Sequence, residues 1–280
     1  MAVEHVVVVG GGGVMGSGIA QVVAGAGLQV TIVEADEPAV ERGLGRIERG
    51  LERRGVDPAV RGRISASTDL EAAAADADHV IETVTEDLAL KAGLLRRLDE
   101  VCRDEVVLAS NTSQFAISRL ASATSRPERV IGSHWFNPPT AMGLIEVVRG
   151  VATSDDTLAL ALELAHRYGK ETVVCRKDTA GFITSRLIAL FMVEAARIVE
   201  EGIADAEDVD RACRLAFGHA MGPLSTADLS GIDVLEAVAD NLARNFGDRF
   251  LPPQSVRALV NAGRLGRKSG HGFMEYDEAR

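Results

Sequence analysis

Residues 6–16 read VVVVGGGGVMG, and this run decides the fold. Four consecutive valines are typical of a buried strand in a parallel sheet. Gly11, Gly13 and Gly16 then fit the pattern GxGxxG, and an apolar helical pattern follows them. In that context the first glycine allows a tight turn, the second lets the backbone approach a pyrophosphate, and the third lets helix and strand pack closely. The run therefore predicts the strand–turn–helix unit of a dinucleotide-binding domain.

The residues around this loop indicate which dinucleotide it binds. A second apolar strand ends at Val33, and Glu34 follows it, about twenty residues after the first glycine. A carboxylate at this position accepts hydrogen bonds from ribose hydroxyls, although a solvated acid at a strand end would give the same pattern. The next three residues, ADE, supply no cation for a 2′-phosphate. We therefore expect NAD, with its phosphates facing the helix N-terminus at Val14 and Met15.

The rest of the chain falls into two parts with different patterns. Apolar runs alternate with helical patterns up to about residue 180, which predicts a mostly parallel, doubly wound sheet. Strands are expected at 5–9, 29–33, 79–83, 106–110, 129–133, 144–148 and 171–175, with helices at 14–24, 39–53, 88–102 and 157–168. Helical patterns alone follow, at 184–201, 206–217, 234–246 and 255–262. The sequence thus predicts an α/β Rossmann domain over 1–180 and an all-α C-terminal domain over 181–280.

The composition excludes several classes of protein. With 46% hydrophobic and 25% charged residues, the 280-residue chain is globular in type. Its net charge of -11 argues against a nucleic-acid partner, which requires a basic surface. Residues 5–33 carry no charged side chain, but glycines interrupt them, so we expect strands and a helix there and not a membrane span. The three scattered cysteines indicate reduced thiols in a cytoplasmic protein, and no metal site is expected.

Ser113, His134 and Glu146 are expected at or near strand ends of the first domain. In open α/β sheets those ends border the cofactor crevice. Oxidation of an alcohol needs a base for the hydroxyl proton, and imidazole titrates near neutrality. A carboxylate can orient the imidazole, and a serine can hold the substrate oxygen. The same residues could instead be a helix cap, a satisfied buried histidine and a solvent-facing acid, and their spacing alone does not decide.

Several motifs, in this order, resemble the L-3-hydroxyacyl-CoA dehydrogenase family over almost the whole chain. They are the glycine loop, ASNTS at 109–113, SHWFNP at 133–138, LIEVV at 144–148, DTAGF at 178–182, MGP at 221–223 and GRKSGHGF at 266–273. The resemblance implies His134 as general base, Glu146 as its partner and Ser113 as the ligand of the substrate hydroxyl. It also implies cofactor contacts from Glu34, Glu86, Lys91, Ser113, Asn137 and Lys268.

The implied reaction is the NAD-dependent oxidation of an L-3-hydroxyacyl thioester of CoA, or its reverse, within fatty acid metabolism. The family resemblance further implies a homodimer formed through the C-terminal helices. Ser185 stands where the family has an asparagine near the catalytic histidine, so we expect Ser185 in the site. A substrate on acyl carrier protein, or a hydroxy acid without a thioester, is an alternative. A non-catalytic NAD-binding protein that kept the fold is another.

The segment 39–64 bears on the choice of carrier. In the family this segment helps hold the CoA nucleotide, but here it is short, and Gly50 stands where the family has a serine that contacts CoA. A cluster of five arginines lies in the first part of the segment, at positions 42, 46, 49, 53 and 54. They could meet phosphates, or they could form a solvated helix face paired with Glu41, Glu48 and Glu52.

Overall fold

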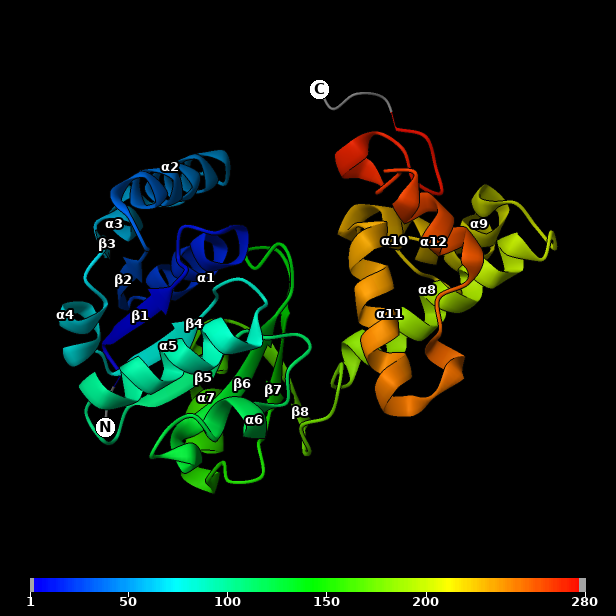
Figure 1. Cartoon of the computed structure of the whole chain (residues 1–280). Helices are drawn as coiled ribbons and strands as arrows, with labels where there is room; N and C mark the ends of the chain where they lie inside the picture. The colour runs from blue at the N-terminus through cyan, green and yellow to red at the C-terminus, as the bar shows by residue number, and fades with distance from the viewer. Residues whose placement is uncertain (1–2, 277–280) are drawn as a thin grey trace. The chain divides into compact units, whose positions relative to one another are not determined.

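The computed structural model describes residues 3–276 and divides into two compact units. The first unit extends to Thr179 and the second begins at Ala180. Figure 1 shows a sheet flanked by helices in the first unit and a group of helices in the second. The predicted fold class, a Rossmann domain followed by a helical domain, is confirmed.

The first unit is built on one eight-stranded sheet with the order β3-β2-β1-β4-β5-β6-β7-β8. Neighbouring strands are parallel except β6 and β7, which are antiparallel. The strand order reverses between β1 and β4, and a crevice forms at the carboxyl ends of strands at such a point. The strands are β1 (His5–Val9), β2 (Gln29–Val33), β3 (Ile64–Ser67), β4 (His79–Glu82), β5 (Val107–Ser110), β6 (Val130–Trp135), β7 (Leu144–Val148) and β8 (Glu171–Cys175).

Helices connect the strands and cover the sheet. One apolar core joins α1 and α7 to the strands, with Val8, Ile19 and Leu164 among its buried members. Figure 1 shows α5 and α6 on the side of the sheet opposite α7. The helical elements of this unit are α1 (Val14–Gly25), α2 (Glu37–Arg53), α3 (Pro58–Arg61), α4 (Leu70–Ala75), α5 (Leu88–Val101), α6 (Ile117–Ala121), η1 (Pro127–Arg129) and α7 (Asp155–Arg167).

The second unit has a core of its own between its helices. Two buried carboxylates connect its elements: Asp210 accepts the N–H groups of Leu224 and Ser225, and Asp228 accepts the hydroxyl of Tyr276 at 2.8 Å. Among residues 3–276 we find no helix with the length and apolar character needed to cross a membrane. The elements are α8 (Thr184–Glu200), α9 (Ala206–Phe217), α10 (Pro223–Ser230), α11 (Ile232–Phe246), η2 (Asp248–Phe250), α12 (Gln254–Asn261) and η3 (Arg267–Ser269).

The structure differs from the expected elements in several places, and the short helices α3, α4 and α6 were not expected. β3 was not expected, because its four residues, ISAS, include two serines and only Ile64 is buried. α10 was also missed, since it is short and begins at Pro223. The sixth strand continues to Trp135, so His134 lies within β6 and does not follow it.

Candidate active site

The glycine loop between β1 and α1 leaves helix N–H groups available to a ligand. Gly13 is the N-cap residue of α1 and has an extended conformation, with no side-chain cap. The N–H groups of the first turn, at Val14, Met15 and Gly16, have no acceptor within the helix. They form an anion site of the kind that binds a pyrophosphate.

Two glycines of this loop are required because neighbouring atoms approach them closely. A Cβ atom at Gly16 would overlap the carbonyl oxygen of Gly10 and the hydroxyl of Thr83. A Cβ atom at Gly12 would overlap the carbonyl oxygen of Ala39 and the carboxylate of Glu34. The loop can therefore fold against β2 and β4 only without side chains at these positions.

A cleft of about 870 Å³ opens beside the glycine loop. Gly12 and Gly13 line it from one side, and Thr83 and Val84, which follow β4, line it from another. Glu34 also lines the cleft, and its Oε1 accepts the Gly12 N–H at 2.6 Å. An open backbone loop, a helix N-terminus and an acid at the end of β2 are the groups that hold a dinucleotide, so the residues present fit NAD.

Arg42 and Arg46 of α2 line the same cleft as Glu34, which sequence reasoning did not foresee. Arg46 donates to the carbonyl oxygen of Gly12 at 2.5 Å. Arg42 and Arg46 are four residues, or about one helical turn, apart, so their side chains lie on the same face of α2. This spacing is the feature of the sequence that could have indicated their shared position.

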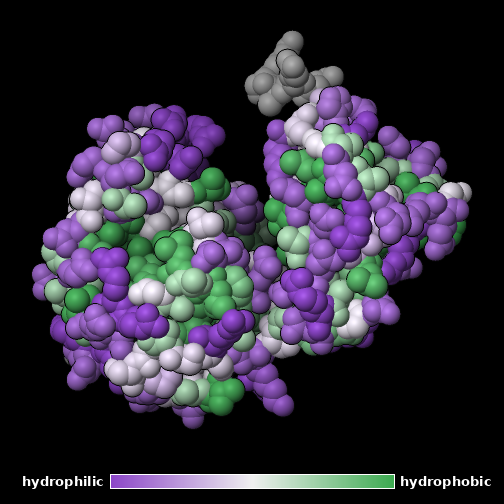
Figure 2. All heavy atoms as spheres, in the orientation of Figure 1, coloured by the Kyte–Doolittle hydropathy of each residue, from purple (hydrophilic) through white to green (hydrophobic). Residues whose placement is uncertain are grey.

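The five arginines clustered at positions 42–54 do not form the ion pairs that a solvated, self-paired helix face requires. Within residues 3–276 none of them pairs with Glu41, Glu48 or Glu52, and Glu48 instead pairs with Arg61 at 3.2 Å. Figure 2 shows hydrophilic residues over the region of α2. The alternative in which these arginines pair with the three acids is therefore wrong; Arg46, Arg53 and Arg54 donate to other protein oxygens.

His134 and Glu146 form a buried pair on adjacent strands. They are directly opposite in the antiparallel register of β6 and β7, and His134 Nδ1 lies 2.8 Å from Glu146 Oε2. Glu146 is 0% exposed and His134 is 7% exposed. Glu146 is thus not a solvent-facing acid, and the carboxylate orients the imidazole through the Nδ1 hydrogen bond.

The carboxyl end of β6 is fixed on both sides of this histidine. Asn111 Oδ1 accepts the backbone N–H of Trp135 at 2.8 Å, and the Trp135 indole donates to Ser133 Oγ at 3.0 Å.

Burial raises the pKa of Cys175, at the end of β8, and the nearby Glu146 carboxylate raises it further. That thiol therefore stays protonated and takes no part as a nucleophile.

Ser113 lies in the loop after β5, which Glu86 holds. Glu86 Oε1 accepts the Thr112 hydroxyl at 2.6 Å, the Ser113 N–H at 2.9 Å and the Gln114 N–H at 3.0 Å. The next helix, α6, begins at Ile117 with Ala116 as its N-cap. Ser113 is therefore not a helix cap, and its half-buried side chain stands in a loop ordered by a carboxylate.

Lys91 is buried and bonded entirely to protein oxygens. Its Nζ donates to Glu82 Oε1 at 2.7 Å and to the Val84 carbonyl at 3.1 Å, and it lies 3.2 Å from Glu86 Oε2. An ammonium group has three N–H donors, so all of them are used. In this structure Lys91 Nζ contacts Glu82, Val84 and Glu86, and the cofactor contact that the family resemblance implied for Lys91 stays a prediction. Glu82 was not foreseen, because nothing in the pattern of a strand marks a buried acid.

The remaining predicted site residues lie in separate places. Asn137 is exposed just after β6 and precedes Pro138 through a cis peptide bond. Ser185 is the second residue of α8, in the second unit. Lys268, also in the second unit, donates to both carboxylate oxygens of Asp233, at 2.5 and 2.7 Å. The residues that the structure brings together thus all belong to the first unit, and roles for Ser185 and Lys268 stay predictions.

A dinucleotide cleft and a buried histidine–carboxylate pair in one Rossmann domain are the features of an NAD-dependent dehydrogenase. Residues 5–179 match the family described as 3-hydroxyacyl-CoA dehydrogenase, NAD binding domain, and residues 181–276 match its C-terminal domain. The chain therefore belongs to the 3-hydroxyacyl-CoA dehydrogenase family, and its cofactor is NAD.

Similar proteins cover the chain from end to end. A 3-hydroxybutyryl-CoA dehydrogenase of Mycobacterium tuberculosis is 41% identical over 98% of this chain and 99% of its own length. A probable 3-hydroxybutyryl-CoA dehydrogenase of Bacillus subtilis is 40% identical over 97% of each chain. The solved (S)-3-hydroxybutyryl-CoA dehydrogenase of Ralstonia eutropha is 36% identical and covers 99% of this chain and 100% of its own, with a TM-score of 0.92.

Proposed function

We propose that this chain oxidises an L-3-hydroxyacyl-CoA to the 3-oxoacyl-CoA with NAD, and catalyses the reverse reaction, with His134 as general base. The buried His134–Glu146 pair is the observation that carries the proposal, because it combines a proton acceptor with a fixed orientation. NAD, when bound, accepts the hydride from the substrate carbon. Membership of the 3-hydroxyacyl-CoA dehydrogenase family supports this reaction class.

Each residue of the pair and its neighbours has a distinct proposed task. Glu146 accepts a hydrogen bond from the Nδ1–H group of His134, which leaves Nε2 as the nitrogen that takes the hydroxyl proton. The Ser113 hydroxyl holds the substrate oxygen, and Ser185 contributes a second hydroxyl from α8. The glycine loop at Gly11, Gly13 and Gly16 holds the pyrophosphate, and further proposed cofactor contacts are Glu34, Glu86, Ser113, Asn137 and Lys268.

The acyl group and its carrier are proposed from the relatives. The similar proteins bear names that specify 3-hydroxybutyryl-CoA, so we expect a four-carbon acyl chain on CoA. Because the arginines of α2 are not neutralised by Glu41, Glu48 or Glu52, they provide a cationic face suited to CoA phosphates.

The test is the oxidation of NADH, followed by its absorbance, with acetoacetyl-CoA, acetoacetyl-acyl carrier protein and free acetoacetate as parallel substrates. We expect acetoacetyl-CoA to give a kcat/KM at least tenfold above either of the others. A higher value for the carrier-protein substrate would replace CoA by that carrier. No consumption of NADH with any of the three would contradict the proposed enzyme.

We also propose a homodimer formed through the second unit, in the cytoplasm. Large apolar side chains are exposed on α8 and α9, namely Leu187 at 65%, Leu215 at 80% and Phe217 at 66%. Large apolar side chains exposed on two helices that pack on each other are the kind of surface that protein interfaces cover. The three cysteines are free and buried, which fits a reducing compartment.

A further inference from the structure

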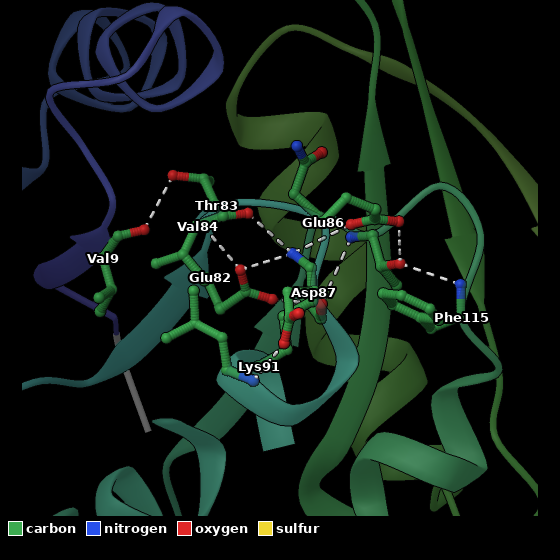
Figure 3. A network of polar contacts seen from close by, with 12 residues as sticks. Val9, Glu82, Thr83, Val84, Glu86, Asp87, Lys91 and Phe115 are labelled. Atoms are coloured by element: carbon green, nitrogen blue, oxygen red, sulfur yellow. Dashed lines mark hydrogen bonds and ion pairs between the residues drawn. The ribbon is translucent and has the colours of Figure 1, made fainter. Parts of the chain in front are cut away.

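A buried cluster of charges lies at the carboxyl end of β4. Glu82 is the last residue of β4 and is 0% exposed, and Lys91 of α5 is 1% exposed. Glu86 completes the cluster and is partly exposed. Figure 3 shows Glu82, Glu86 and Lys91 drawn together between β4, the start of α5 and the loop after β5.

The hydrogen bonds of this cluster are saturated, so its geometry is fixed. Glu82 Oε1 accepts from Lys91 Nζ and, at 2.7 Å, from the Val84 N–H. Glu82 Oε2 accepts the hydroxyl of Ser110, the last residue of β5, at 2.6 Å. A buried carboxylate is retained only with such a set of partners.

The formal charge of the cluster is negative. Two carboxylates, Glu82 and Glu86, share one ammonium group, which leaves one negative charge uncompensated. Within residues 3–276, Lys91 is the one cationic side chain that forms an ion pair with either carboxylate. Because Glu82 and Lys91 are excluded from solvent, this charge is screened less than a surface charge.

The topology places the cluster beside the nicotinamide half of the cofactor. The strand order reverses between β1 and β4, and Glu34 follows β2 on the adenosine side. In this fold the second nucleotide lies over the other half of the sheet, at the ends of β4, β5 and β6. Thr83 and Val84, the residues directly after Glu82, line the cleft.

We propose that Glu82 gives the nicotinamide site a net negative charge, so that the site favours the oxidised, positively charged ring over the reduced, neutral ring. Glu82 does not touch the cofactor in this proposal, because it is buried behind the residues that line the cleft. It acts on the nicotinamide ring through the electrostatic field of its carboxylate. The inference depends on NAD binding, not on the acyl substrate, so its test needs no substrate.

The test compares the Kd values of NAD⁺ and NADH by titration calorimetry for the full chain. Glu82→Gln removes one negative charge, and the amide can still accept from Lys91 and donate to Ser110. We expect the ratio of the NAD⁺ Kd to the NADH Kd to rise roughly three- to thirtyfold, the effect of one unit charge in a partly dry site. Ser110→Ala removes a hydrogen bond without changing the formal charge, and should leave the ratio within twofold of the unaltered protein.

Two further variants separate charge from structural damage. Lys91→Gln makes the cluster more negative, so the same ratio should fall. The double variant Glu82→Gln/Lys91→Gln restores the original net charge without the ion pair, and its ratio should return to within about twofold of the unaltered protein. Structural damage would instead raise the Kd values of NAD⁺ and NADH by similar factors, and these factors would be largest in the double variant.

The proposal is overturned if a folded Glu82→Gln protein has a Kd ratio within twofold of the unaltered protein. It is also overturned if the double variant has the same raised ratio as Glu82→Gln. Folding is checked for each protein by its thermal unfolding transition. If Glu82→Gln does not fold, Lys91→Gln decides: a lower ratio supports the proposal, and an unchanged or higher ratio overturns it.

Discussion

Glu34 and Arg42 line the same cleft and have opposite effects on a 2′-phosphate. The carboxylate repels it by roughly 4 kcal/mol at about 4 Å and an effective dielectric constant near 20, before screening. A third of that energy corresponds to about a tenfold preference for NAD. Arg42 would attract the same phosphate once the acid is removed.

We therefore predict that Glu34→Ala lowers the preference for NADH over NADPH by at least about tenfold. The measurement is kcat/KM for both cofactors with one acyl substrate. Glu37→Ala, which removes an acid outside the cleft lining, should leave the preference unchanged. Comparable efficiency with NADPH in the unaltered protein would show that Glu34 does not select the cofactor.

Ser185 provides a second test at the scale of one residue. A serine hydroxyl both donates and accepts, as an asparagine amide does, but it is shorter. One neutral hydrogen bond contributes about 1 kcal/mol, so Ser185→Asn should change kcat on acetoacetyl-CoA by less than about tenfold. Ser185→Ala should have an effect of similar size. Abolished activity in Ser185→Asn would instead mean that the site is shaped for a different acyl group.

Strand β4 has a buried ionisable residue at each end, a histidine at its start and a glutamate at its end. His79 is 3% exposed, and no other described residue bonds its Nδ1. Burial disfavours the imidazolium and lowers the pKa of His79 to about 4. The folded pKa lies below the unfolded value near 6.5, so His79 favours folding above pH 6.5 and loses that contribution as the pH falls towards 4.

We predict that His79→Leu reduces the acid sensitivity of folding. Between pH 7 and pH 4.5 the unaltered protein should lose about 2 kcal/mol more unfolding free energy than the variant, because the variant has no imidazole to protonate at this position. Urea unfolding at the two pH values measures the difference. His166→Leu, which removes an exposed histidine of α7, is the control. An equal loss in unaltered and His79→Leu proteins would contradict the assignment.

How far the elements could be predicted depends on how much of each is apolar. β1 was evident because Val6–Val9 form an unbroken apolar run, which predicts a buried strand without knowledge of its neighbours. All four valines are buried in the structure. β3 could not be predicted, because an edge strand of four residues with one buried side chain depends on pairing with β2 for its existence. The ends of α2 and α11 differ by two residues from the expected ones, which is the usual fraying of boundaries.

The site was predictable only where chemistry and chain position coincide. Ser113, His134 and Glu146 were visible in the sequence as polar residues in or after strands of one sheet, but the pairing of His134 with Glu146 depends on the antiparallel register of β6 and β7. The cluster at Glu82 was not visible, because its partners come from β4, β5 and α5. Long-range contacts of this kind leave no local pattern.

For the whole molecule, the exposed apolar side chains of the second unit predict association. We expect a molar mass near twice the chain's 29.6 kDa in light scattering. Leu215→Glu places a charge at an 80% exposed position of α9, where desolvating it in an interface would be costly, and should shift the protein towards monomer. Val151→Glu, at a 91% exposed position of the first unit, should leave the mass unchanged. A monomer before any substitution would contradict the proposed dimer.

Replacing His134 by glutamine tests most directly whether the buried pair carries the proton transfer. The measurement is kcat for acetoacetyl-CoA reduction, together with the Kd of NADH. We predict that kcat falls by about two to four powers of ten. The Kd of NADH should change by less than about threefold, because neither His134 nor Glu146 lines the cofactor cleft. Glu146→Gln should also lower kcat. A folded His134→Gln protein with nearly unaltered kcat would show that another group is the base.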